Sequence, residues 1–164
     1  MALEIADNYI PVLSRVDKII GDTACGGACG VNLLYRNGII VSEADVGLEP
    51  FSAERLKGAI NLLAEESSMT PFDGGQVPLE QFENLLFDPD RGPWLALLDE
   101  RQNDIGHWVI VEGVLENGNV SILDPGSARP DADDAGGLAY ELTVESFREL
   151  FHNGSGTGGA VFQP

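Results

Sequence analysis

The apolar residues of this chain follow two different spacings, and the change between them divides the sequence near residue 93. Before the change, Leu56 and Ile60 lie one turn apart within 53–65, which is typical of one face of a helix. After it, the expected spacing is two residues, which is typical of strands, and 107–115 is one of the expected strands. Helices followed by strands predict an α+β fold in which the helices pack on a C-terminal antiparallel sheet.

Capping and turn residues predict where each element begins and ends. Asp22 or Thr23 can cap a helix from about 25 to 35, and Asn37-Gly38 would end it. Asn117-Gly118 predicts a tight turn that joins two antiparallel strands. The other expected helices are 53–65 after Ser52, one that begins at Pro78 with Phe82, Leu85 and Leu86 inward, and one from Thr143 to Phe151. The expected strands are 94–98, 107–115, 120–123, 140–142 and 160–162, with a short extended piece over 39–41 and a polar loop over 126–138.

Length and composition indicate one folded domain over 1–164, with 1–22 as an N-terminal arm. A chain of 164 residues with 43% hydrophobic residues can bury a core without disulfides. Nine basic and twenty-seven acidic residues leave a net charge of −18, which repels nucleic acid phosphates and anionic lipids. We therefore expect no nucleic acid partner and no membrane partner. The charge would suit a basic partner or substrate, but solubility alone is the favoured explanation.

The sequence shows no sign of a signal peptide, a membrane span or a cofactor. The first residues include early acids and no apolar core segment, and no apolar run approaches the roughly 20 residues of a membrane helix. Two Cys and two His could in principle bind zinc, but the Cys-X2-Cys and His-X3-His spacings of zinc sites do not occur. We expect no metal, and we expect His152 to be a cation near the C-terminus of its helix. The acids at 131, 133 and 134 are expected in a solvated loop, since the Gly and closing Glu of an EF-hand are missing.

The sequence offers a candidate nucleophile, base and orienting acid: Cys25, His107 and Asp124. A thiol is a good nucleophile as thiolate, which both a helix N-terminus and an adjacent imidazolium favour. Cys25 opens the expected helix, His107 opens a strand, and Asp124 ends the strand paired with it, where it could orient the imidazole. Cys29, one turn further along, is expected as a small apolar core residue. Glycines at 26, 27 and 30 each cost about 1 kcal/mol in a helix relative to Ala, so other groups are expected close to this backbone.

Four motifs carry a resemblance to a known superfamily: Ala24-Cys-Gly-Gly-Ala-Cys-Gly-Val-Asn-Leu-Leu, Gly106-His-Trp-Val-Ile-Val-Glu-Gly-Val, Ile122-Leu-Asp-Pro-Gly and Tyr140-Glu-Leu-Thr-Val-Glu-Ser-Phe. In this order they resemble the papain-like cysteine peptidases, and more narrowly the small bacterial branch of bacteriocin-leader peptidases and papain-fold toxin domains. The resemblance covers about 20–163 and implies a papain-like fold. It also implies that Cys25 is the nucleophile, His107 the base and then the acid, and Asp124 the orienting group.

The sequence departs from this pattern at the oxyanion hole. The family usually has a Gln about six residues before the nucleophile, where it completes the hole, and Ile19 occupies that position here. The hole would then use the Cys25 backbone N–H together with Thr23, Asn8 or a nearby amide.

The resemblance implies a cysteine endopeptidase that acts on a protein substrate. Similarity to toxin domains, small size and the missing signal peptide suggest an effector. It would be made in the producer's cytoplasm and delivered by a specialised secretion route into the cytoplasm of a competing or host cell, with an immunity protein as partner. A free-standing chain from Met1 favours the effector, because leader peptidases are normally fused to a transporter. Two alternatives stay open: glutamine deamidation or acyl transfer through the same thioester, and a non-catalytic binding module, which Ile19 favours.

Overall fold

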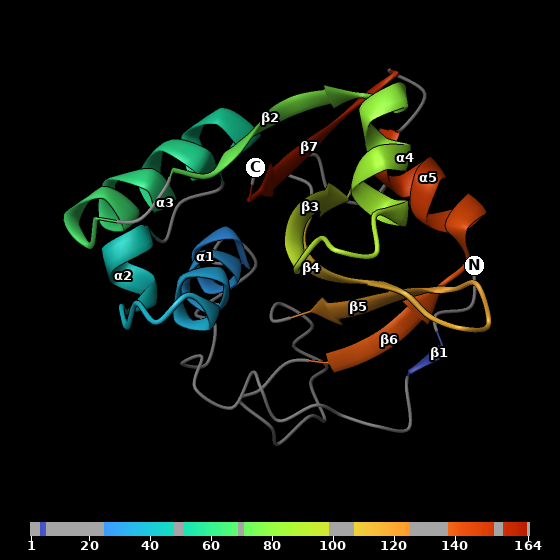
Figure 1. Cartoon of the computed structure of the whole chain (residues 1–164), viewed down its shortest axis with the longest axis horizontal. Coiled ribbons are helices and arrows are strands. Elements are labelled where there is room, and N and C mark those ends of the chain that lie inside the picture. Colours follow the sequence, from blue (N-terminus) through green and yellow to red (C-terminus); the bar gives the residue numbers. More distant parts are fainter. Residues whose placement is uncertain are drawn as a thin grey trace.

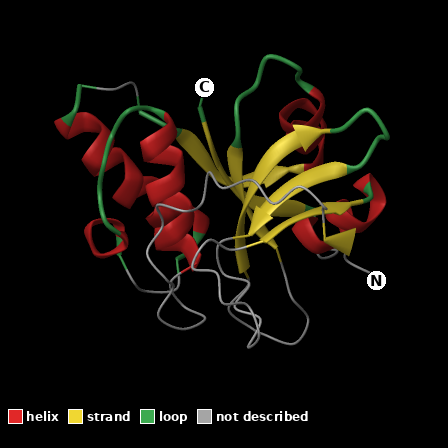
Figure 2. Ribbon diagram, turned by 90° about the horizontal axis from the view of Figure 1, so that it is seen from below, coloured by secondary structure: helices red, strands yellow, loops and turns green. Residues whose placement is uncertain are grey.

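The fold is an antiparallel sheet with helices on both faces (Figures 1 and 2). The computed structural model describes residues 4–5, 25–47, 51–68, 71–98, 107–124, 138–152 and 156–163, and of residues 4, 5, 25, 43 and 138 the backbone alone. Within these ranges the sheet has seven strands in the order β1-β6-β5-β4-β3-β7-β2, and every neighbouring pair is antiparallel. The strands are β1 (Glu4–Ile5), β2 (Asp73–Pro78), β3 (Trp94–Leu98), β4 (His107–Val114), β5 (Val120–Asp124), β6 (Leu138–Leu142) and β7 (Thr157–Phe162), and the helices are α1 (Cys25–Arg36), α2 (Glu43–Val46), α3 (Ala53–Glu66), α4 (Leu79–Phe87) and α5 (Val144–His152).

Alternation along the strands divides the buried residues into two clusters, one on each face of the sheet. In β4, Trp108 and Ile110 belong to the cluster beneath α1, α2 and α3, which we call the first core. Val109 and Val111 belong to the second core, beneath α4 and α5. Figure 1 shows the two groups of helices on opposite sides of the strands. Because both faces of β4 are buried, its central residues form a continuous apolar run rather than an alternating one.

The predicted α+β class is confirmed, and so are most of its elements. Ser52 caps α3 by accepting a hydrogen bond from the Arg55 backbone N–H at 3.3 Å. Thr143 does the same for α5 through the N–H of Ser146 at 3.1 Å. These caps satisfy N–H groups that have no partner within the helix, which is why short polar side chains marked both helix starts correctly.

Two elements were missed, and the start of one helix needs correction. Strand β2 was missed, because its two glycines lower strand propensity, and Pro78 ends this strand instead of starting α4. The expected extended piece over 39–41 belongs to none of the described strands: Ile39 and Val41 pack against the first core, and Ile40 is exposed. The short helix α2, which follows this piece, was not expected. Of the expected arm over 1–22, Glu4 and Ile5 pair with β6, and the rest lies outside the described residues.

Gly74 explains why a glycine-rich segment can still be a strand here. Its φ is +143°, and an added Cβ would lie 2.1 Å from the Ala160 carbonyl oxygen. Glycine at this position is therefore required for β2, the edge strand, to pair with β7.

His152 is a buried ring and not a surface cation. Its side chain ends α5 with 6% of its surface exposed, and its ring meets those of Phe82 and Phe151 edge-on at centroid distances of 5.1 and 4.8 Å. Burial lowers the pKa of His152 below the ordinary value of 6.5; the charge of Arg148 lowers it further, and a hydrogen bond with the Thr157 backbone acts in the opposite direction. The expectation of a cation was wrong, because desolvation of the ring opposes protonation at this helix end.

None of the helices in the described part of the chain is long and apolar enough to cross a membrane.

Candidate active site

His107 and Asp124 lie against each other where two neighbouring strands meet the end of the sheet. His107 is the first residue of β4 and Asp124 the last of β5. His107 Nε2 lies 2.6 Å from Asp124 Oδ1, and 12% and 7% of the two side chains are exposed. A hydrogen bond that involves a carboxylate is stronger than a neutral one, and exclusion of water strengthens it further.

A bulge in β4 brings these two side chains to the same face of the sheet. Val114 pairs with Val120 and Ile110 with Leu123, so four steps along β4 match three along β5. The extra residue lies between Val111 and Gly113, and the φ of Gly113 is +138°. Continued to its end, this register puts Asp124 diagonally across from His107, within reach of its side chain. Without the extra residue, Asp124 would face the other side of the sheet.

Tyr140, on the strand at the other side of β5, holds the second oxygen of the same carboxylate. Its hydroxyl donates a hydrogen bond to Asp124 Oδ2 at 3.0 Å, and both residues are buried. Tyr140 pairs with Ile122, two residues before Asp124, and so shares a face with it. Sequence reasoning placed Tyr140 in a strand without assigning it a site role. The contact of Tyr140 with Asp124 depends on the register between β6 and β5. No short turn in the sequence fixes that register.

Cys25 is the first residue of α1. The atoms that surround the next residue, Gly26, show where this helix begins relative to the sheet. A Cβ on Gly26 would lie 3.1 Å from Trp108 Cδ1 and 2.9 Å from Phe51 Cδ2. Trp108 directly follows His107, so the N-terminus of α1 lies against the strand that carries the histidine. The N–H groups of such a terminus stabilise a thiolate. The expectation of close contacts along this glycine-rich helix is confirmed at Gly26, and again at Gly30, where an added Cβ would lie 3.0 Å from Val46 Cγ1.

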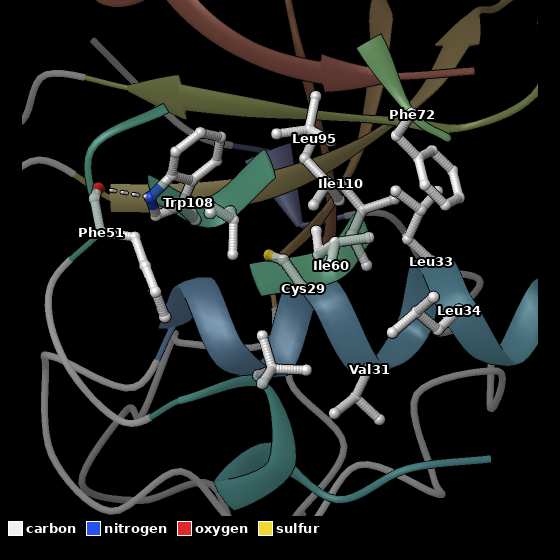
Figure 3. Packing of buried hydrophobic residues seen from close by; sticks show 14 of the residues in the cluster. Cys29, Val31, Leu33, Leu34, Phe51, Ile60, Phe72, Leu95, Trp108 and Ile110 are labelled. Carbon is white, nitrogen blue, oxygen red and sulfur yellow. Dashed lines mark hydrogen bonds between the residues drawn. The ribbon is translucent and has the colours of Figure 1, made fainter. Parts of the chain in front are cut away.

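Trp108 and Phe51 form the wall against which the first turn of α1 packs (Figure 3). The indole N–H of Trp108 donates to the Phe51 carbonyl oxygen at 3.0 Å, and this hydrogen bond is buried. It ties the segment before α3 to β4. The place of the helix start is thus set by a contact between β4 and a segment that lies far from it in sequence.

Cys29 lies one turn further along α1 and is completely buried in the first core. Figure 3 shows its sulfur directed from the helix toward the apolar side chains of the sheet. The prediction that Cys29 packs as a small apolar residue is confirmed. A thiol at this place is out of reach of a protein substrate.

The remaining candidates fall outside the part of the chain that the structure describes. Thr23 and Asn8, the expected oxyanion donors, are among them, as are Ile19 and the acids at 131, 133 and 134. Of the side chains that are described, no three or more His, Cys, Asp or Glu gather in a way that could hold a metal ion.

No protein family model matches the chain. It is similar to a protein named cysteine protease effector 1 from Escherichia coli O1:K1:H7, with 31% identity over 152 residues. The matched region covers 92% of this chain and 27% of that protein. The chain thus spans about a quarter of the length of the curated relative it matches.

Proposed function

We propose that this chain is a cysteine peptidase with Cys25 as nucleophile, His107 as base and then acid, and Asp124 as the orienting group. The observation that carries the proposal is the His107–Asp124 pair, with its 2.6 Å contact, at the end of a sheet against which a helix headed by Cys25 begins. The name of the Escherichia coli relative, cysteine protease effector 1, supports the same chemistry.

The proposed mechanism follows from which ring nitrogen Asp124 engages. Because Nε2 of His107 faces Asp124, Nδ1 is the nitrogen that would take the proton of the Cys25 thiol. The thiolate attacks the peptide carbonyl carbon, and the carbonyl oxygen becomes an oxyanion. As the C–N bond breaks, His107 returns the proton to the leaving amine and a thioester remains. His107 then takes a proton from water, the hydroxide displaces the sulfur, and the acid product leaves.

Asp124 acts in each step by holding the imidazole ring in one orientation and stabilising the imidazolium that forms. The backbone N–H of Cys25 would stabilise the oxyanion, with Thr23 or Asn8 as the second donor. Each such donor is commonly worth about 3 kcal/mol in the transition state. The fold that we propose for this chemistry is papain-like: a helix headed by the nucleophile packs on an antiparallel sheet that supplies the histidine and the acid.

We further propose that the peptidase is an effector that acts on a protein inside a target cell, after delivery by a specialised secretion route. The word effector in the name of the Escherichia coli relative supports this setting. A producer of such a peptidase would need a cognate immunity protein, because its own proteins would be at risk.

Mass spectrometry of new protein N-termini tests the proposal directly. A bacterial lysate is incubated with the purified wild-type protein, with Cys25→Ala, or with Cys29→Ala as the matched control. Wild type and Cys29→Ala should produce the same new N-termini, and Cys25→Ala should produce none. New N-termini in the Cys25→Ala sample would overturn the peptidase assignment.

The same samples separate the peptidase from its alternatives. Glutamine converted to glutamate without chain cleavage would indicate a deamidase, and an acyl group moved onto another amine would indicate a transferase. Growth inhibition by Cys25→Ala, expressed as a folded protein inside cells, would indicate a binding module. Each of these results contradicts the proposed reaction.

A further inference from the structure

We infer that Tyr140 is a positioning residue of the proposed triad, acting on His107 through Asp124. The inference rests on the proposed function and deepens it. Its basis is a chain of two hydrogen bonds across three neighbouring strands: Tyr140 OH donates to Asp124 Oδ2 at 3.0 Å, and Asp124 Oδ1 contacts His107 Nε2 at 2.6 Å.

The carboxylate of Asp124 needs such an anchor because its terminal torsion is soft. The torsion that rotates an Asp carboxylate has broad minima, so packing alone defines the direction of its oxygens poorly. Here both oxygens are engaged, one by Tyr140 and one by His107, so a rotation that lengthened one contact would lengthen the other. The direction of Oδ1 is therefore coupled to the position of the tyrosine hydroxyl.

The position of Tyr140 is itself well fixed. Its backbone lies between two strands, paired with Ile122 on one side and with Ile5 on the other. Its side chain is buried in the second core. Along the strands, Tyr140 lies opposite Ile122, two residues inside the end of β5, whereas His107 is the first residue of β4. A buried side chain therefore holds the carboxylate that would orient the histidine ring.

Tyr140→Phe distinguishes a role of Tyr140 in packing from a role in positioning Asp124. The ring of Tyr140 contributes to the second core, and Tyr140→Phe keeps every carbon atom of it. What the change removes is the hydroxyl, and with it one hydrogen bond to Asp124. Tyr35→Phe is the matched control, because it removes a tyrosine hydroxyl away from the proposed triad. Tyr35 is partly buried and lies in the last turn of α1.

The rate at which iodoacetamide alkylates Cys25 at about pH 6 reports on the thiolate without any knowledge of the substrate. The alkylated peptide is quantified by mass spectrometry over time. We expect His107→Ala and Asp124→Ala to slow the reaction. We expect Tyr140→Phe to slow it about tenfold, because the change removes one hydrogen bond to a carboxylate. Tyr35→Phe should leave it unchanged.

A double-mutant comparison tests whether Tyr140 acts through Asp124. In an Asp124→Ala background, Tyr140→Phe should cause no further slowing, because the group on which it acts is gone. The same factor in both backgrounds would overturn the inference, and so would an unchanged rate in Tyr140→Phe alone. Should Tyr140→Phe be unfolded by circular dichroism, Tyr140→Met removes the hydroxyl with a side chain that adapts to irregular gaps, and the same slowing is expected.

The alkylation assay distinguishes failure of the proposed triad from failure of the role inferred for Tyr140. If His107→Ala left the alkylation rate of Cys25 unchanged, the triad itself would be wrong. If His107→Ala and Asp124→Ala slowed the reaction while Tyr140→Phe did not, the triad would stand and the role of Tyr140 would fall.

Discussion

Gly26→Ala should destabilise the protein, although the same change in most helices stabilises it. An Ala side chain here would place its Cβ 2.9 Å from Phe51 Cδ2 and 3.1 Å from Trp108 Cδ1. Ordinary contacts between carbon atoms are about 3.5–4.0 Å, so at least one neighbour has to move by roughly 0.6 Å. The indole N–H of Trp108 donates to the Phe51 carbonyl oxygen, so a shift of the Trp108 ring would weaken this buried hydrogen bond.

The expected magnitude follows from two opposing effects. Overpacking of a core by one methyl group costs about 1–3 kcal/mol. Replacement of Gly by Ala in a helix gains about 1 kcal/mol. The free energy of unfolding should therefore fall by about 0–2 kcal/mol in Gly26→Ala.

Gly58→Ala is the matched control, because Gly58 lies within α3 and an added Cβ there meets no atom within 4 Å. It should raise the free energy of unfolding by about 0.5–1 kcal/mol. Urea denaturation of both variants, followed by circular dichroism, gives the difference directly. If Gly26→Ala were stabilised as much as Gly58→Ala, then α1 would not be packed against Trp108 as described. The proposed peptidase activity should fall in Gly26→Ala, because Cys25 moves with the helix start, and persist in Gly58→Ala.

Two further changes test other parts of the structure. Trp108→Phe leaves the buried Phe51 carbonyl without its indole donor, so the free energy of unfolding should fall by at least about 1–3 kcal/mol; an unchanged urea midpoint would show that the bond contributes nothing. The pKa of His152 is lower in the folded protein than its ordinary value of 6.5, so the unfolded chain binds the proton more readily, and stability should decline as pH falls below about 6.5. His152→Gln removes this titration, so its melting temperature should fall less than that of wild type between about pH 7.5 and about pH 5.5; parallel melting curves would contradict the burial of a neutral ring.

The sequence was sufficient to predict the proximity of His107 and Asp124, because the signal for it is local. Asn117-Gly118 predicts a tight turn, and in the structure the Leu115 N–H donates to Asn119 O at 2.8 Å while Gly118 has a φ of +87°. Strands on either side of such a turn pair with each other, so residues at their far ends come together. The bulge before Gly113 decides on which face they meet, and a single extra residue leaves no clear mark in an apolar pattern.

The sequence was insufficient wherever a role depends on partners far along the chain. The contact of Tyr140 with Asp124 depends on the register of β6 against β5, which no turn sequence fixes. His152 was expected to be a cation because a helix C-terminus favours positive charge; that it is buried between Phe82 and Phe151 follows from how α5 packs against α4. Strand β2 could not be predicted because glycines are unusual in strands. The reason for Gly74 is its close contact with Ala160, which lies far away in sequence.

The place of β7 in the sheet has a consequence for how the chain folds during synthesis. This strand lies between β3 and β2: Ala160 is aligned with Ala96 on one side and with Gly75 on the other. While a ribosome is still making residues 157–162, β3 lacks one neighbour and β2 lacks the strand that joins it to the sheet. A nascent chain can therefore form β3, β4 and β5 early, but β2 has to wait for β7. The edge of the sheet that carries β2 is completed after the strands that carry His107 and Asp124 are already in place.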